Sequence, residues 1–373
     1  MTSPPTGEDA GPRPHGPGGP PAAARDLPHD PPGGARVTPP STPQDAPAPG
    51  PARRAARLLP GLVVGAVTLA LPAVLDDSAL TVYIFLGLAA MVTVGVSLLM
   101  GYAGQVSLGQ GAFYAVGGYT AGILAVRGGP PIAGLLAAPV VAAAFAVVVG
   151  VPLLRLRGHH LAFATLAMQL IVLSLAGRLA ITGGDIGLQA IPPFGWGSFE
   201  LTGAVGYAYL TWGGVALVML VTRNVIVSRP GRALRALATS ETAAASSGVP
   251  VGRYKLVVFA LSAAFAGLAG GIYAYYTGYV APSSFPVLLS IEYIVMAVVG
   301  GLGTVWGAVV GAAAITLLVQ ALNLIGTAPG MPSYAPSVLS YAVYAVVLIT
   351  VVLFLPRGLF PAAVARLRRA PRP

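Results

Sequence analysis

Apolar residues in this chain are grouped into long blocks, each the length of a helix, and polar stretches separate the blocks. Uncharged apolar blocks recur, each of about twenty residues, the length that an α-helix needs to cross roughly 30 Å of hydrocarbon. A membrane β-barrel would need strands of about ten residues with strict alternation, and these blocks do not alternate. The pattern therefore predicts an all-α, polytopic membrane helical bundle with about ten transmembrane segments, at 58–75, 79–100, 107–126, 132–154, 160–178, 206–227, 256–277, 287–300, 303–325 and 337–355.

The segment 287–300 is short for a membrane span, because a helix of this length rises only about 21 Å. A re-entrant loop here would move the C-terminus, with its arginines, to the opposite side of the membrane. We therefore interpret 287–300 as a tilted, thinned or broken span.

Composition supports the membrane assignment and excludes several classes of chemistry. Hydrophobic residues make up 55% of the chain and charged residues 9%, whereas soluble domains carry roughly 25% charged residues. The absence of cysteine excludes disulfides and thiolate metal sites. The sequence also lacks the His-Glu-x-x-His and Gly-x-Ser-x-Gly patterns and a P-loop, since its only lysine, Lys255, follows Tyr254 and not glycine. The chain is therefore expected to be no enzyme, to bind no cofactor, and to leave any ATP hydrolysis to another subunit.

Three regions are expected along the chain. Residues 1–57 contain 16 of the 35 prolines and no apolar periodicity, which predicts a disordered, uncleaved cytoplasmic tail rich in Pro, Gly and Ala. Residues 58–359 form the transmembrane domain, and 360–373 form a basic cytoplasmic tail.

The arginines indicate the orientation of the chain in the membrane. Basic residues gather on the cytoplasmic side of membrane proteins, so the distribution predicts that both termini are cytoplasmic in an inner or plasma membrane. The basic residues on that side would include Arg53, Arg54, Arg57, Arg155, Arg157, Arg223, Arg229, Arg232, Arg235, Arg253, Lys255, Arg357, Arg366, Arg368, Arg369 and Arg372, against Arg127 and Arg178 outside. The net charge of +10 is thus a topology signal.

Two glycine-rich breaks, at 101–111 and 300–307, separate apolar segments and predict interrupted helices. An interrupted helix exposes backbone groups that can bind a substrate if they line a cavity, and helix termini carry partial charges that suit a zwitterion. Alternatively, these glycines are small-residue packing contacts. The candidate substrate-pathway residues at the breaks are Gly101, Gly104, Gln105, Ser107, Gly109, Gln110, Gly300, Gly301 and Gly303.

Further candidates lie in the longest outer connection and in the segment 287–300. Thr182, Gly183 and Gly184 open that connection, which contains Trp196 and continues to Trp212; it could meet a substrate-delivery protein, or the tryptophans could anchor it at lipid headgroups. Glu292 is the only acidic residue inside an expected span, and either a pathway role or an interfacial position is open to it. No metal site is expected, because the neighbouring histidines 159 and 160 would point about 100° apart on a helix.

The cytoplasmic connection after 227 predicts one helix of about 18 residues, at about 230–247. Ser228 can cap it, Pro230 suits its first turn, and Gly248 with Pro250 ends it. Arg232 and Arg235 are too few for a nucleic-acid surface, so we expect this alanine-rich helix to fit a socket on a soluble partner. A helix lying at the lipid headgroups is the alternative.

These motifs together resemble the LivM-type permease family of branched-chain amino acid ABC transporters. The resemblance runs in order over about residues 80 to 358, through 101–118, 156–167, 182–188, 231–255 and 290–311. Glu241, Ala244 and Gly248 resemble the Glu-Ala-Ala…Gly coupling loop of such importers, although the glycine stands one residue later than in the common form. The resemblance implies that Arg232, Arg235, Glu241, Ala244 and Gly248 meet an ATPase.

The resemblance also implies partners and a mechanism. The expected assembly contains a homologous second permease, two ABC ATPase subunits and an extracytoplasmic substrate-binding protein, all acting at membrane lipid and without nucleic acid. The chain is expected to move branched-chain or related amino acids by alternating access that the ATPases drive. Urea or short amides are the alternative substrates, and an ion-coupled secondary transporter is a second alternative, which the scarcity of membrane carboxylates disfavours.

Overall fold

The computed structural model describes residues 68, 70–156, 158–196, 199–201 and 203–326, with isolated positions beyond (342, 345, 346, 349 and 358–360). These residues belong to one compact unit, Leu58–Pro373. The α-helices are α2 (Asp77–Ala103), α3 (Gln110–Val126), α4 (Pro131–Leu153), α5 (His159–Arg178), α6 (Ala204–Val227), α7 (Arg229–Thr239), α8 (Glu241–Ser246), α9 (Val251–Thr277), α10 (Val287–Gly300) and α11 (Val305–Gly326).

The all-α prediction is confirmed for the described part of the chain. Seven helices there are long and apolar enough to cross a membrane, among them Pro282–Gly300, which is α10 together with the preceding 3-10 turn η4 (Pro282–Ser284). The expected segment 287–300 coincides with α10. The expected segments 58–75 and 337–355 lie almost wholly outside the described residues.

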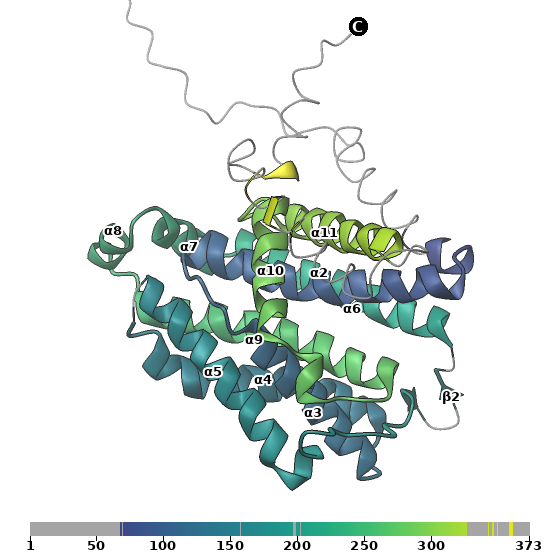
Figure 1. Ribbon diagram of the computed structural model, residues 1–373. Helices are drawn as coiled ribbons and strands as arrows, with labels where there is room; N and C mark the ends of the chain where they lie inside the picture. Colours follow the sequence, from purple (N-terminus) through teal and green to yellow (C-terminus); the bar gives the residue numbers. More distant parts are fainter. Residues whose placement is uncertain are drawn as a thin grey trace, which may run out of the picture. The chain divides into compact units, whose positions relative to one another are not determined.

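The helices form two groups that α9 and α10 connect (Figure 1). One group contains α2, α6 and α11, and the other contains α3, α4 and α5. Helix α9 packs against α4, α3 and α2, while α10 crosses between the groups and contacts α11, α2 and α3. Helix α2 is apolar all round, and 89% of its most apolar 18-residue stretch is buried, so it is the innermost helix of its group.

Helices α4, α5, α6 and α11 cover the outside of the unit, and only about a quarter to a third of the residues in their apolar stretches are buried. Exposed residues on them include Val140 and Val148 of α4, Ile171 of α5 and Leu217 of α6. Such surface would be unfavourable in water and is suited to lipid, where apolar side chains need no burial in protein. These helices are therefore the expected lipid-facing wall of a membrane bundle.

The connection between α5 and α6 contains short elements of secondary structure. It lies at one end of the bundle, and we call this end the hairpin end. It contains the 3-10 turn η3 (Ala180–Thr182) and an antiparallel hairpin of β1 (Gly195–Trp196) and β2 (Phe199–Glu200), with Trp196 opposite Phe199. Trp212, which we expected to continue this connection, lies inside α6. Its ring stacks on Tyr83 at 4.7 Å and its indole N–H donates to the Tyr83 carbonyl at 3.3 Å, so it is a packing residue.

The expected single helix at 230–247 is two helices, α7 and α8, which we call the elbow. Helix α7 ends at Thr239, Ser240 is extended, and the Ser240 side chain accepts a hydrogen bond from the Ala243 N–H to start α8. Serine favours helix starts because it competes for backbone donors, and this local bond breaks the helix. Ser228 occupies the N-cap position of α7, as predicted, but its hydroxyl donates to the Val225 carbonyl at 2.6 Å and caps no N–H.

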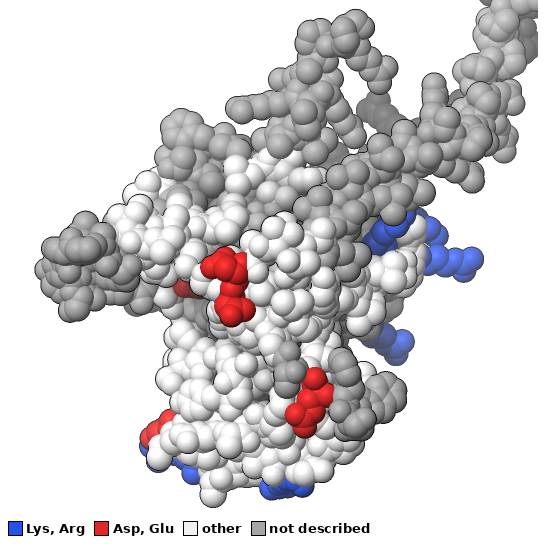
Figure 2. Space-filling model, turned by 90° about the vertical axis from the view of Figure 1, so that its right-hand side faces the viewer, with Lys and Arg blue, Asp and Glu red and all other residues white. Residues whose placement is uncertain are grey.

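Charged residues are few on the face at the hairpin end: Figure 2 shows separate acidic patches among uncharged side chains, with basic side chains towards its edges. Asp76, Asp77 and Glu200 stand at the ends of α2 and of β2 on this side. The elbow, with Arg229, Arg232 and Arg235, lies at the opposite ends of α6 and α9. The helices therefore separate basic from acidic ends in the order that the sequence predicts, while the orientation of the termini stays a prediction.

Candidate functional site

The first glycine break interrupts the chain between α2 and α3. Helix α2 ends at Ala103 because Gly104 adopts a left-handed conformation (φ 63°), and the Gln105 N–H closes the turn on the Leu99 carbonyl at 3.2 Å. The chain is not helical again until Gln110. This segment, 104–109, is the interruption that the sequence predicts.

The second break lies between α10 and α11 and packs directly on the first. Gly301 and Gly303 have φ values of 111° and 75°, which glycine tolerates best. A Cβ atom at Gly101 would overlap the backbone of Gly303, so the two chains cross at van der Waals contact. The Tyr102 hydroxyl donates to the Gly303 carbonyl at 2.9 Å, and the Gly303 N–H donates to Ser97 Oγ at 3.2 Å. Gly101 and Gly303 thus form a close crossing, as the packing alternative expects.

A buried polar cluster lies beside the first break and joins three helices. Ser290 Oγ of α10 donates to Gln169 Oε1 of α5 at 2.7 Å and accepts the Gly111 N–H of α3 at 2.8 Å. Gln169 Nε2 also reaches the Phe285 and Pro286 carbonyls at 3.4 Å. Both Gln169 and Ser290 are 0% exposed, so these bonds satisfy polar groups that are shielded from solvent.

The cluster continues along the break itself. The Thr165 hydroxyl accepts the Leu108 N–H at 2.9 Å, which ties the non-helical segment to α5. Gly109 packs so closely on Thr165 and Met168 that a side chain there would overlap them. Ser107 is 1% exposed, and its hydroxyl accepts the Gly109 N–H at 3.4 Å. The non-helical segment is therefore held in one conformation by α5.

Two glutamines of the break are buried with unused hydrogen-bonding capacity. Gln110 Nε2 donates to Ser262 Oγ of α9 at 3.2 Å, whereas its Oε1 atom has no partner among the described residues. Gln105 is 3% exposed, and neither polar atom of its side chain has a partner there. An unsatisfied buried polar group destabilises the folded protein by about 1–3 kcal/mol, so a hydrogen bond from these atoms to a polar ligand or a water molecule would be favourable.

Two helix N-termini converge on this cluster. Gly111 is in the first turn of α3 and Ser290 is in the first turns of α10, and the two residues are hydrogen-bonded to each other. The start of a helix carries a partial positive charge near half a unit. The cluster is consequently an uncharged site with a positive electrostatic bias.

An aromatic cluster, centred on Phe285, packs next to the polar one. The Phe285 ring lies 5.3 Å from the ring of Tyr114, 5.7 Å from that of Tyr273 and 6.3 Å from that of Tyr119. Phe285 is fully buried, and it directly precedes the Pro286 carbonyl that Gln169 contacts. The rings therefore fill the space on one side of the polar cluster.

The predicted outer residues lie away from the polar cluster. The Thr182 hydroxyl donates to the carbonyls of Ala176 and Leu179 at 2.6 and 2.7 Å, which ends α5. Gly183 and Gly184 have positive φ values of 79° and 63° and form the following turn. Their structural task is a tight turn at the hairpin end, and a pathway role for them stays a prediction.

Glu292 is half-buried on α10. It follows Ser290 by two positions, so it points to a different face of the helix, because successive residues rotate by about 100°. Glu292 therefore lies two residues from Ser290 and on another face of α10.

The elbow brings most of the predicted coupling residues to one end of the bundle. Leu234 and Leu237 bury one side of α7, whereas Arg232 and Arg235 are exposed on it. Ala244 is 2% exposed, and Gly248 ends α8 with φ 79°. Glu241 is joined to Lys255 Nζ of α9 at 2.7 Å, a contact that sequence reasoning did not predict.

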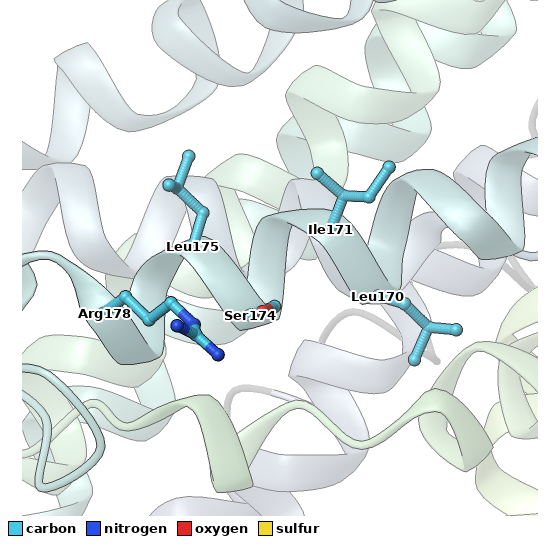
Figure 3. A pocket seen from close by; sticks show the side chains of 5 residues that line it. All are labelled: Leu170, Ile171, Ser174, Leu175 and Arg178. Atoms are coloured by element: carbon cyan, nitrogen blue, oxygen red, sulfur yellow. The ribbon is translucent and has the colours of Figure 1, made fainter.

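Helix α5 also carries a shallow apolar depression on its outer side (Figure 3). It is lined by residues of this helix alone: Leu170, Ile171, Ser174, Leu175 and Arg178. Gln169 of the same helix is directed into the bundle, so α5 separates the polar cluster from this outer surface.

Sequence reasoning missed four members of the polar cluster: Thr165, Gln169, Ser262 and Ser290. A signal for two of them was present. Thr165 and Gln169 stand four residues apart in an apolar stretch, which places both on one face of a helix. Ser262 and Ser290 are single hydroxyl residues, and only the tertiary structure brings them to Gln110 and Gln169.

Comparisons with known proteins agree with this architecture. Residues 78–352 match the family model described as "Branched-chain amino acid transport system / permease component". The chain is 35% identical over 280 residues to the high-affinity branched-chain amino acid transport system permease protein LivM of Escherichia coli, covering 66% of this chain and 62% of that one. It is 34% identical over 265 residues to the protein of the same name from Salmonella typhimurium, covering 62% and 59%.

A more distant relative, the probable branched-chain amino acid transport permease protein LivM of Methanocaldococcus jannaschii, is 26% identical over 244 residues, covering 62% of this chain and 70% of that one. No solved structure matches the chain. The aligned part thus spans about three fifths of the two bacterial relatives. Because the family model covers most of the sequence, this multi-pass membrane protein belongs to the family of permease components of branched-chain amino acid transport systems.

Proposed function

We propose that this chain is a permease subunit of an ATP-binding-cassette importer that moves branched-chain amino acids across the membrane. The observation that carries the proposal is the match of residues 78–352 to the permease family. The buried polar cluster supports it, because an uncharged site between two helix N-termini suits a zwitterion. The substrate carboxylate would lie at the starts of α3 and α10, and the glutamine oxygens would accept from its ammonium group.

The chain would supply the substrate path and, in the elbow, the segment that the ATPases move, while partner subunits supply the energy. Its only lysine is Lys255, which lacks the glycine of a P-loop, so ATP hydrolysis falls to other chains. The assembly would contain a second permease, two ATPases and an extracytoplasmic binding protein. ATP-driven closure of the ATPases would move the elbow, and the bundle would expose the cluster to each side in turn.

An ion-coupled transporter would normally need carboxylates along its path. Glu292 is the only acidic residue in an expected span. This scarcity of membrane carboxylates therefore favours the importer over an ion-coupled transporter.

Two measurements test the proposal. Tagged chain, purified from its native membrane in mild detergent, should bring down an ATPase subunit, as neither a secondary transporter nor a membrane enzyme would. Vesicles with the assembled transporter should take up radiolabelled leucine in the presence of ATP, with valine and isoleucine competing and urea and short amides not competing. Uptake that an ion gradient drives without ATP would refute the importer.

A further inference from the structure

The only ion pair that the structure shows among the described residues joins the elbow to the bundle. Lys255 Nζ donates to Glu241 Oε2 at 2.7 Å. Glu241 is the first residue of α8, and Lys255 lies in the first turns of α9. The Lys255 side chain is 14% exposed and that of Glu241 is 44% exposed. The pair therefore lies at the boundary between the elbow and the membrane bundle.

Helix α8 has few other contacts that fix its position. It contains six residues, too few for a helix to be stable without tertiary support. Its supports are the Ser240 cap, the burial of Ala244, the turn at Gly248 and the ion pair. Of these, the ion pair is the one formed by side chains of both α8 and α9, so it fixes α8 relative to α9.

Helix α9 continues from the ion pair to the polar cluster. Ser262 follows Lys255 by seven residues, so it lies about two turns further and on nearly the same face of the helix. There the Ser262 hydroxyl accepts a hydrogen bond from Gln110 at the start of α3. One face of one helix thus carries a contact with the elbow and a contact with the candidate substrate site.

We propose that Glu241 and Lys255 form the link through which movement of the elbow is transmitted to α9 and, through Ser262, to the polar cluster. The inference rests on the proposed function and deepens it. Glu241 acts within this chain as a positioning residue for α8, and its carboxylate is occupied by Lys255 and not reserved for an ATPase. The ATPase then contacts the elbow through other exposed residues, such as those of α7.

A charge exchange tests the link in the assembled transporter, reconstituted in proteoliposomes. Glu241→Lys and Lys255→Glu each place like charges together and should lower leucine uptake per ATP hydrolysed by about threefold or more, since exposed ion pairs are weak but like charges repel. The double exchange restores an opposite-charge pair and should return coupling to within about twofold of the unsubstituted protein. Arg253→Gln removes a nearby exposed positive charge without touching the pair, so coupling should not change.

A second measurement examines the pair without any transport. Since Lys255 is the only lysine, its acylation by an amine-reactive ester can be followed by mass spectrometry of the one peptide that contains it. Glu241→Gln should accelerate acylation, because the ammonium group loses its partner and is released to solvent. Arg253→Gln should leave the rate unchanged.

The outcomes separate the link from the proposed function. Acylation that Glu241→Gln leaves unchanged would show that no pair forms, and would overturn the inference. So would a double exchange that stays as uncoupled as Glu241→Lys alone, because Glu241 would then act on another chain. Acceleration together with rescue would support it. If the unsubstituted transporter imports no amino acid, the proposed function fails, while the acylation rates still show whether Glu241 and Lys255 form a pair.

Discussion

The crossing of Gly101 and Gly303 should tolerate no added atom. In Gly101→Ala the new Cβ would overlap the Gly303 backbone and approach the Leu302 carbonyl carbon. Backbone atoms cannot rotate away as a side chain can, so α2 and the second break would have to separate by on the order of 1 Å to reach normal contact distances of about 3.5 Å. Overpacking of this kind typically costs about 1–3 kcal/mol.

The separation would also stretch two hydrogen bonds that hold the crossing. They join the Tyr102 hydroxyl to the Gly303 carbonyl at 2.9 Å and the Gly303 N–H to Ser97 at 3.2 Å. Each such bond contributes about 0.5–1.5 kcal/mol. The substitution should therefore destabilise the protein by about 2–6 kcal/mol in total, if both bonds are lost.

The measurement is thermal unfolding of the purified chain in detergent, followed by tryptophan fluorescence, together with leucine uptake by the assembled transporter. Gly101→Ala should lower the midpoint by several degrees and reduce uptake. Gly213→Ala is the matched control, because its Cβ would meet no atom within 4 Å on the exposed side of α6, so it should leave both quantities unchanged or raise the midpoint slightly. An unchanged midpoint and normal uptake in Gly101→Ala would refute the reasoning.

Three further predictions concern the path and the topology. Gly109→Val should block uptake, because the valine side chain would overlap Thr165 and Met168, and normal uptake would contradict this packing argument. Gly104→Val should act differently, because a Cβ there meets no atom within 4 Å, and valine would instead strain the left-handed backbone. Glu292→Gln should reduce leucine uptake only modestly, and its complete loss would indicate ion coupling. Reporter enzymes fused to either terminus should be active only in the cytoplasm, and a C-terminal reporter active outside would exclude the ten-span model.

The sequence predicts the helices well because apolar length is a strong local signal, and α10 begins and ends where its pattern does. It fails where a local hydrogen bond competes with helix propensity: alanines around 236–245 favour one helix, yet Ser240 caps a second one. The glycine breaks were predicted from composition. Their contact with each other, and the partners of Gln110 and Ser290, depend on residues more than one hundred positions away and have no local signal.

The burial of α2 has a consequence for how the chain is made. Its neighbours α9 and α11 follow it by about 150 and 200 residues, so at roughly 5–20 residues per second they emerge from the ribosome on the order of 10 to 40 seconds later. During that interval α2 must reside in the bilayer with lipid on the faces that protein later covers. A helix that is apolar on every side can wait in this way, whereas one with a polar stripe would require an early partner. The uniform hydrophobicity of α2 therefore suits the order of synthesis as well as the finished bundle.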